Sequence, residues 1–109
     1  MTDTLNPAIA GYIDDLNRRD NESLIRRFTP KAVVVDEGET YRGTDEIRQW
    51  IARTQAAFEF TLETLRAEQH GGETIVTCRV TGSFPGSPAD LRHFFTLEGD
   101  RIAALTIRV

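Results

Sequence analysis

The chain has 109 residues, with 13 basic and 17 acidic side chains and a net charge of −4 at pH 7. This length suits a single domain over residues 1–109 and is too short for two. Hydrophobic residues make up 39% and charged residues 28%, which is typical of a globular protein and not of a disordered one. The acidic balance and the lack of a basic run disfavour nucleic acids and membrane surfaces as partners.

The compartment follows from the cysteine count and from the hydrophobic pattern. Cys78 is the only cysteine, so no internal disulfide forms and a reducing compartment is favoured. Residues 1–4 lack the basic and apolar regions of a secretory signal. No apolar run approaches the ~20 residues that span a bilayer. We therefore expect a cytoplasmic protein.

The first predicted element is an amphipathic helix that begins at Asn6-Pro7, since Asn caps helices and Pro fits the first turn. Its apolar face follows helical spacing through Ile9, Tyr12, Ile13 and Leu16. The remaining positions predict a solvated face made of Asp14, Asp15, Asn17, Arg18 and Arg19.

A shorter second helix is predicted around Leu24, Ile25 and Phe28, and Pro30 should end it because proline disfavours helix in the residue before it. The β-branched residues 33–35 then predict a short strand with both faces covered. Residues 36–38 form a turn, and residues 40–42 form a short partner strand.

Thr44 is predicted to cap a third helix that ends near Ala57 or Phe58. After it the period changes to that of strands, predicted over residues 60–69, 73–81, 91–98 and 101–109. Gly71-Gly72 and Gly99-Asp100 supply tight turns, and residues 82–89 form a loop. Three helices followed by antiparallel strands indicate an α+β fold in which the helices cover one face of a curved sheet. The open end of such a sheet is the natural ligand site.

Asp36, at the end of the first strand, is the best candidate for proton chemistry, because a partly buried carboxylate can act as a general base. The alternative is a turn residue that caps backbone amides before Gly38. His70, His93 and Cys78 lack the local spacing of a metal site, so no metal is predicted. No phosphate loop or nucleophile elbow occurs, and no cofactor is expected.

Four segments carry a family resemblance: residues 12–17, 28–36, 41–47 and 99–102. Through them nearly the whole chain resembles the SnoaL-like and ketosteroid-isomerase-like domains of the nuclear transport factor 2-like superfamily. The resemblance implies a cone-shaped α+β barrel, with three N-terminal helices packed into a strongly curved, mostly antiparallel sheet around a central pocket. It also implies a homodimer formed through the sheet. Such a fold hosts many functions.

In the ketosteroid isomerases, a tyrosine on the first helix donates to the oxyanion and an aspartate after the first strand is the base. Tyr12 and Asp36 match these two by position, although Tyr12 also fits a plain core aromatic. The isomerases' second donor is an aspartate before a His-Phe pair, whereas Arg92 precedes His93-Phe94 here. This departure argues against steroid isomerisation, and an arginine near Asp36 would lower its pKa.

Further ligand contacts are predicted from the same comparison. Strand alternation puts Arg92 and Phe94 on the less apolar face, which favours solvent, whereas the family register points both into the pocket. Trp50 and Phe84 are predicted wall residues, and Tyr41 a rim residue or part of a solvated edge.

The sequence thus predicts a pocket protein for a small apolar or carbonyl-bearing ligand. The leading hypothesis is a cofactor-free enzyme of the isomerase or cyclase type, with Asp36 as base and Tyr12 as oxyanion donor. One alternative is a non-catalytic ligand-binding or dimerisation module. A weaker alternative is a hydratase or epoxide hydrolase, which needs a second carboxylate or a polar network to position water.

Overall fold

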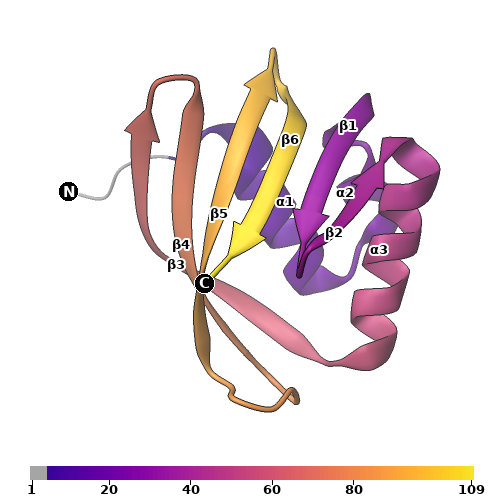
Figure 1. Ribbon diagram of the computed structural model, residues 1–109, viewed down its shortest axis with the longest axis vertical. Helices are drawn as coiled ribbons and strands as arrows, with labels where there is room; N and C mark the ends of the chain where they lie inside the picture. The colour runs from indigo at the N-terminus through magenta and orange to yellow at the C-terminus, as the bar shows by residue number, and fades with distance from the viewer. Residues whose placement is uncertain (1–4) are drawn as a thin grey trace.

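The computed structural model describes residues 5–109 as an α+β fold of helices and one sheet (Figure 1). The helices are α1 (Pro7–Arg18), α2 (Asn21–Ile25) and α3 (Gly43–Ala57). The strands are β1 (Phe28–Asp36), β2 (Glu39–Arg42), β3 (Phe60–His70), β4 (Glu73–Gly82), β5 (Ala89–Glu98) and β6 (Arg101–Arg108). Among residues 5–109, the helices are too short or too polar to cross a membrane.

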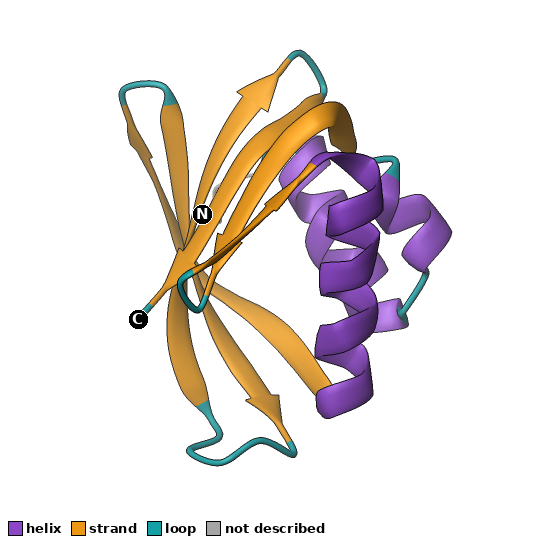
Figure 2. Cartoon of the chain, turned by 45° about the vertical axis from the view of Figure 1, so that its right-hand side comes forward, coloured by secondary structure: helices purple, strands orange, loops and turns teal. Residues whose placement is uncertain are grey.

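The sheet is mixed, with strand order β2-β1-β6-β5-β4-β3. The β1–β6 pair is parallel and the other pairs are antiparallel, so the predicted mostly antiparallel arrangement is confirmed. Strands β2 and β3 lie at the two edges, so the sheet is open. The expected cone-shaped barrel, with a strongly curved sheet around a central pocket, is therefore not confirmed. The helices lie on one side of this sheet (Figure 2).

The core lies between the inner face of the sheet and the helices. Cross-strand register aligns Val34, Leu105 and Phe95 in one row, and each of these side chains is fully buried. Tyr12 of α1 packs edge-on against Phe95, with ring centroids 5.5 Å apart. The apolar stripe predicted for the first helix is therefore the stripe that covers the sheet.

The boundaries differ from the prediction at two places. Phe28 opens β1 instead of lining the second helix, and Pro30 lies within that strand, where the β1–β6 register shifts and proline is tolerated. Arg42, not Thr44, is the N-cap of α3. The backbone N–H of Arg42 donates to Glu46 Oε1 at 2.8 Å, so a side chain from the first turn of α3 pairs this N–H at the N-terminus of the helix.

Asp15 is buried, which corrects its assignment to the solvated face of α1. Its carboxylate accepts from Arg27 Nε at 2.8 Å, Ser23 Oγ at 2.9 Å and Arg18 Nη2 at 3.1 Å. Burial alone would raise the pKa of Asp15, but these donors outweigh it and lower the pKa. The Arg27 guanidinium reaches Asp15 across Gly11, where a Cβ would overlap it.

Candidate functional site

Asp36 is the last residue of β1, and its side chain faces the helices. It lies two positions after the buried Val34, so the strand pleat puts both on the inner face. Trp50 of α3 is 5% exposed, and its indole Nε1–H donates to Asp36 Oδ2 at 3.0 Å. The Asp36 carboxylate is therefore held by a side chain from another element and does not serve only as a turn cap.

Asp36 is half-buried, and burial raises the pKa of its carboxyl group. The Trp50 hydrogen bond and the backbone N–H of Glu37 act in the opposite direction, and the Glu37 charge adds to the rise. Burial dominates because these two neutral donors replace only part of the lost hydration. A carboxylate with a raised pKa is a stronger base, which suits proton abstraction.

Tyr12 of α1 lies fully buried on the same face. Its ring makes edge contacts with Phe28, His93 and Phe95, at centroid distances of 6.0, 6.4 and 5.5 Å. The hydroxyl has no hydrogen-bond partner within residues 5–109. Burial, followed by the Asp36 charge, raises the pKa of Tyr12 far above its usual value. The phenol therefore keeps its proton and remains a donor.

His93 of β5 is a functional candidate that the sequence did not suggest beyond the rejected metal site. Register connects Asp36 to Ile107 and Ile107 to His93, so the three share one row on the inner face. His93 is 2% exposed, its ring stacks on Phe95 at 6.1 Å, and its Nδ1 has no partner in the described chain. Burial lowers its pKa to about 4, although the nearby backbone groups of Leu91 and Val76 act in the opposite direction, so the imidazole is neutral at pH 7. The sequence signal that could have revealed His93 is its alternation with Leu91 and Phe95 along the strand.

Of the predicted wall and rim residues, Trp50 contacts Asp36 and Tyr41 contacts Trp50. The Tyr41 and Trp50 rings are 6.3 Å apart, and Arg53 Nη1 donates to the Tyr41 hydroxyl at 3.1 Å. Phe84 lies in the loop after β4, where it packs edge-on against Phe58 at 5.9 Å. The structure therefore brings Trp50 to Asp36 and Tyr41 to Trp50, whereas Phe84 packs against Phe58.

Arg92 and Phe94 lie on the outer face of the sheet, so the family register that pointed them inward is corrected. His93 and Phe95 contact Tyr12 on the inner face, and alternation sends their neighbours to the opposite side. The Arg92 guanidinium is exposed and stands over the Phe94 ring at 5.4 Å. The position of the isomerases' second oxyanion donor is therefore not equivalent here.

Metal or thiol chemistry at this cluster would involve Cys78, which lies on the same face of the sheet as His93 and acts on the pKa of Tyr12. Within residues 5–109, no group of three or more His, Cys, Asp or Glu side chains could hold a metal ion. Cys78 is buried, and burial raises the pKa of its thiol to about 11, so it remains protonated at pH 7.

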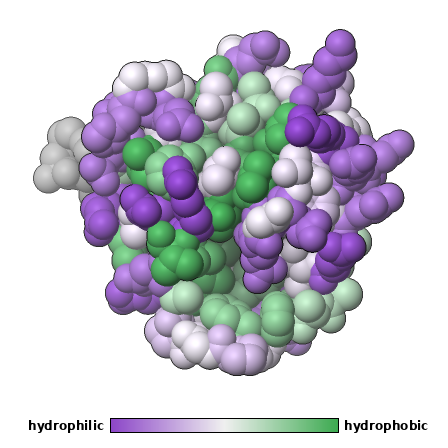
Figure 3. All heavy atoms as spheres, viewed as in Figure 1, coloured by the Kyte–Doolittle hydropathy of each residue, from purple (hydrophilic) through white to green (hydrophobic). Residues whose placement is uncertain are grey.

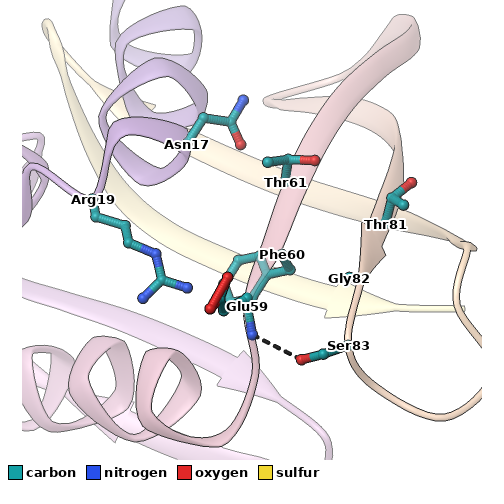
Figure 4. Close-up of a pocket in the computed structure, with 8 residues that line it drawn as sticks. All are labelled: Asn17, Arg19, Glu59, Phe60, Thr61, Thr81, Gly82 and Ser83. Carbon is teal, nitrogen blue, oxygen red and sulfur yellow. Dashed lines mark hydrogen bonds between the residues drawn. The ribbon is translucent and has the colours of Figure 1, made fainter.

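An open depression of about 520 Å³ lies at another corner of the molecule (Figure 4). It is lined by the end of α1 and by residues 59–61 and 81–83. Its polar groups join elements: Asn17 exchanges two hydrogen bonds with the Leu62 backbone, and Ser83 Oγ accepts from the Glu59 N–H at 3.0 Å. We place the candidate site at Tyr12, Asp36 and His93, because Tyr12 and His93 keep buried, unpaired polar atoms on the face that holds Asp36.

Several solved structures share this fold. A proposed polyketide cyclase from Sinorhizobium meliloti is 35% identical, covers 95% of each chain and has a TM-score of 0.92. A ketosteroid isomerase-like protein from Catenulispora acidiphila, solved with trimethylamine, is 19% identical over 97% of this chain and 87% of its own, with a TM-score of 0.84. A Mycobacterium tuberculosis epoxide hydrolase is 14% identical over 94% and 79% of the two chains, with a TM-score of 0.76. The last two show the fold alone.

No curated protein sequence matches the chain. The family model of the SnoaL-like domain matches residues 9–105, which include α2, α3, strands β1 to β5 and most of α1 and β6. This match covers well over half of the chain, and the Sinorhizobium meliloti structure agrees with it over nearly the whole length. The chain belongs to the SnoaL-like domain family.

Proposed function

We propose that this protein binds a small, largely apolar carbonyl compound between α1 and the inner face of the sheet, and that it transfers a proton on that compound. The observation that carries the proposal is the pair of buried, unpaired polar atoms, Tyr12 Oη and His93 Nδ1, on the face that holds Asp36. A buried polar atom without a partner costs about 1–3 kcal/mol. A ligand oxygen that accepts from these groups would offset that cost.

The chemistry assigns one role to each group. Asp36 accepts a proton from the carbon next to the carbonyl, and its raised pKa favours this step. The electron pair of the broken C–H bond moves to the carbonyl oxygen, and Tyr12 donates a hydrogen bond to the resulting oxyanion. His93, neutral and in ring contact with Tyr12, is a second neutral donor in its Nδ1–H tautomer. Return of the proton from Asp36 to another carbon completes an isomerisation, and attack of the enolate on a second carbonyl carbon forms a ring.

The test is deuterium incorporation into cyclohexanone in D2O, followed by NMR. The wild type should exchange the protons next to the carbonyl, and Asp36→Asn should reduce the exchange by about 10²–10⁴-fold. Asp100→Asn is the control, because Asp100 is an exposed aspartate on the turn between β5 and β6. Exchange by Asp36→Asn at the wild-type rate, with the fold intact by circular dichroism, would refute the assignment of the base.

The alternative is a non-catalytic binding module. Arg92, which replaces the isomerases' second acidic donor, lies outside the site, and this observation favours binding without turnover. Saturable binding of cyclohexanone, measured by NMR shifts of Tyr12 and His93, without any deuterium exchange would identify this function.

We also propose a homodimer formed through the outer face of the sheet. Partly buried apolar side chains stand on this face, among them Val33, Val35, Ile75 and Ala104. Figure 3, seen from the side away from α1, shows a green apolar band between hydrophilic side chains. Light scattering should give twice the mass of one chain, and a single-chain mass at micromolar concentration would contradict the dimer.

A further inference from the structure

Trp50 of α3 connects Asp36 to the helix layer, although the sequence predicted it as a wall of the ligand pocket. The indole Nε1–H donates to Asp36 Oδ2 at 3.0 Å, and the residue is 5% exposed. An indole has one N–H donor and no acceptor, so this bond uses the only polar group of the side chain. The Trp50 side chain therefore has no polar group left for a ligand.

Asp36 lies where the backbone leaves the sheet, and its carboxylate depends on Trp50 for its orientation. Asp36 is the last residue of β1, and Glu37 and Gly38 after it have positive φ angles of 53° and 79°. Within residues 5–109, Trp50 is the only side chain that hydrogen-bonds to the Asp36 carboxylate. Without this donor, the carboxylate could adopt other staggered rotamers.

The ionisable groups around Asp36 do not replace this contact. In the part of the chain that the structure describes, no Lys, Arg or His nitrogen lies within 4.0 Å of the Asp36 carboxylate. The nearby acids are Glu37, next in the chain, and Glu39, its cross-strand partner on β2. Tyr12 and His93 on the inner face are neutral at pH 7. An arginine would orient the carboxylate but strongly reduce its basicity, whereas an indole orients it without adding a charge.

The Trp50 ring is itself held in place by the next layer of side chains. The Tyr41 ring lies 6.3 Å away with a tilt of 40°, and the Tyr41 hydroxyl accepts from Arg53 Nη1 at 3.1 Å. Trp50 and Arg53 are three residues apart on α3, so they lie on one face of the helix. A buried donor that is supported in this way can fix the group to which it donates.

We propose that Trp50 is a positioning residue for the base: it holds Oδ2 of Asp36 and so leaves Oδ1 to accept the proton. This inference rests on the proton transfer proposed for Asp36. It changes the expected role of Trp50 from a wall that touches the ligand to a support behind the carboxylate. The rate of proton transfer should then depend on Trp50 and ligand binding should not, because a shift of about 1 Å in a reacting group can cost about 10²-fold in rate.

The first test needs no substrate, because Trp50 is the only tryptophan of the chain. The full chain therefore gives one indole N–H signal in a 15N NMR spectrum. This signal should titrate with pH along the same curve as the 13C signal of the Asp36 carboxyl group, and it should lose that titration in Asp36→Asn. In Trp50→Phe the pKa of Asp36 should rise, because a donor to the charged form is lost. An indole signal that does not follow Asp36 in the wild type would overturn the inference.

The second test is deuterium exchange of cyclohexanone, measured against ketone concentration and pH. Trp50→Phe, which keeps an aromatic ring, should lower the maximal rate about 10–100-fold and change KM by less than about twofold. The acid limb of its pH profile should move to higher pH, since Asp36 must be ionised to accept a proton. Phe58→Leu is the control, because Phe58 follows the same helix and packs against Phe84. It should leave the rate and the pH profile unchanged.

The outcomes separate this inference from the proposed function. An unchanged rate and pH profile in folded Trp50→Phe, or a loss confined to KM, would overturn the positioning role while the wild type still exchanges deuterium. No exchange by the wild type, together with an indole signal that follows Asp36, would refute the proposed proton transfer and support Trp50 as the group that orients the carboxylate.

Discussion

Two partly or fully buried carboxylates, Asp15 and Asp36, show how differently one small core treats the same chemical group. Asp15 accepts from three side chains on α1, α2 and the segment before β1, and the pKa of Asp15 is lowered. Asp36 accepts from the indole of Trp50, and the pKa of Asp36 is raised. The first carboxylate is compensated and holds helices together, whereas the second keeps its basicity.

The polar groups around the two carboxylates also differ, because they are paired around Asp15 and unpaired near Asp36. Around Asp15, the nearby donors are consumed by the carboxylate itself. On the face that holds Asp36, Tyr12 and His93 keep buried polar atoms without a partner. A saturated polar cluster stabilises a fold, and an unsaturated one is available to a ligand. The contacts within this chain are therefore sufficient to distinguish Asp15, which stabilises the fold, from Asp36, which is available for chemistry.

The largest expected effect is on stability at Asp15. Asp15→Ala leaves the Arg27 guanidinium without its partner and should reduce the free energy of unfolding by about 3–5 kcal/mol. Asp14→Ala is the control, because the Asp14–Arg18 pair is exposed and should contribute below about 1 kcal/mol. Urea denaturation of the three proteins measures both changes. Similar losses of unfolding free energy in Asp15→Ala and Asp14→Ala would show that the buried Asp15 contributes no more than an exposed aspartate.

The next effect is a pH dependence that arises at His93. The pKa of this histidine is about 4 in the folded chain, against its ordinary value of 6.5. Below pH 6.5 the unfolded chain binds a proton that the folded chain does not, so stability falls between pH 6.5 and 4, by about 3 kcal/mol in total. His93→Phe keeps the ring and should abolish this part of the loss. His70→Asn, at an exposed site, should not.

A smaller effect is expected at Gly11, beneath the Arg27 guanidinium. The Cβ of Gly11→Ala would overlap that group and push it away from Asp15, so we expect a loss of about 1–3 kcal/mol despite the better helix propensity of alanine. The same substitution combined with Asp15→Ala should cost less, since Arg27 is already released. Additive losses in a double-mutant cycle would show that Gly11 acts independently of Asp15.

The smallest effect on stability is expected at Asp36. Asp36→Asn keeps an oxygen that can accept from Trp50 and removes a partly buried charge, so stability at pH 7 should change by less than about 1 kcal/mol. A raised pKa means that the folded chain binds a proton before the unfolded chain does. The stability of the wild type relative to Asp36→Asn should therefore rise as the pH falls toward 4. If the stability of the wild type fell relative to Asp36→Asn over that range, the pKa of Asp36 would be lowered, as that of Asp15 is.

Local pattern was sufficient to predict the order of elements and the fold class. The helical spacing of Ile9, Tyr12 and Leu16 identified the buried stripe of α1, and strand alternation alone would have put Arg92 outside and His93 inside. The family register overrode the correct alternation for Arg92. Periodicity was informative here because each of these elements has one dry face.

Long-range contacts could not be read from the sequence. The burial of Asp15 depends on Arg27, which is twelve residues away, and on Gly11, which makes room for it. The Trp50–Asp36 bond likewise joins a helix to a strand end across the β2 hairpin. Such pairs depend on how the elements pack in space, and no local spacing encodes them. Tyr12 and Asp36 were found through a positional match and not through such a contact.

The position of β6 has a consequence for assembly of the sheet during synthesis. Residues 101–108 are made after all the other strands, yet they lie between β1 and β5. Until they emerge, the β1–β2 hairpin and the β3–β5 meander have no strand that joins them, and the row that links Asp36 to His93 is interrupted. Closure over so long a stretch of chain is slow relative to hairpin formation. Before residues 101–108 are made, β1 and β5 therefore both lack the strand that lies between them in the folded sheet.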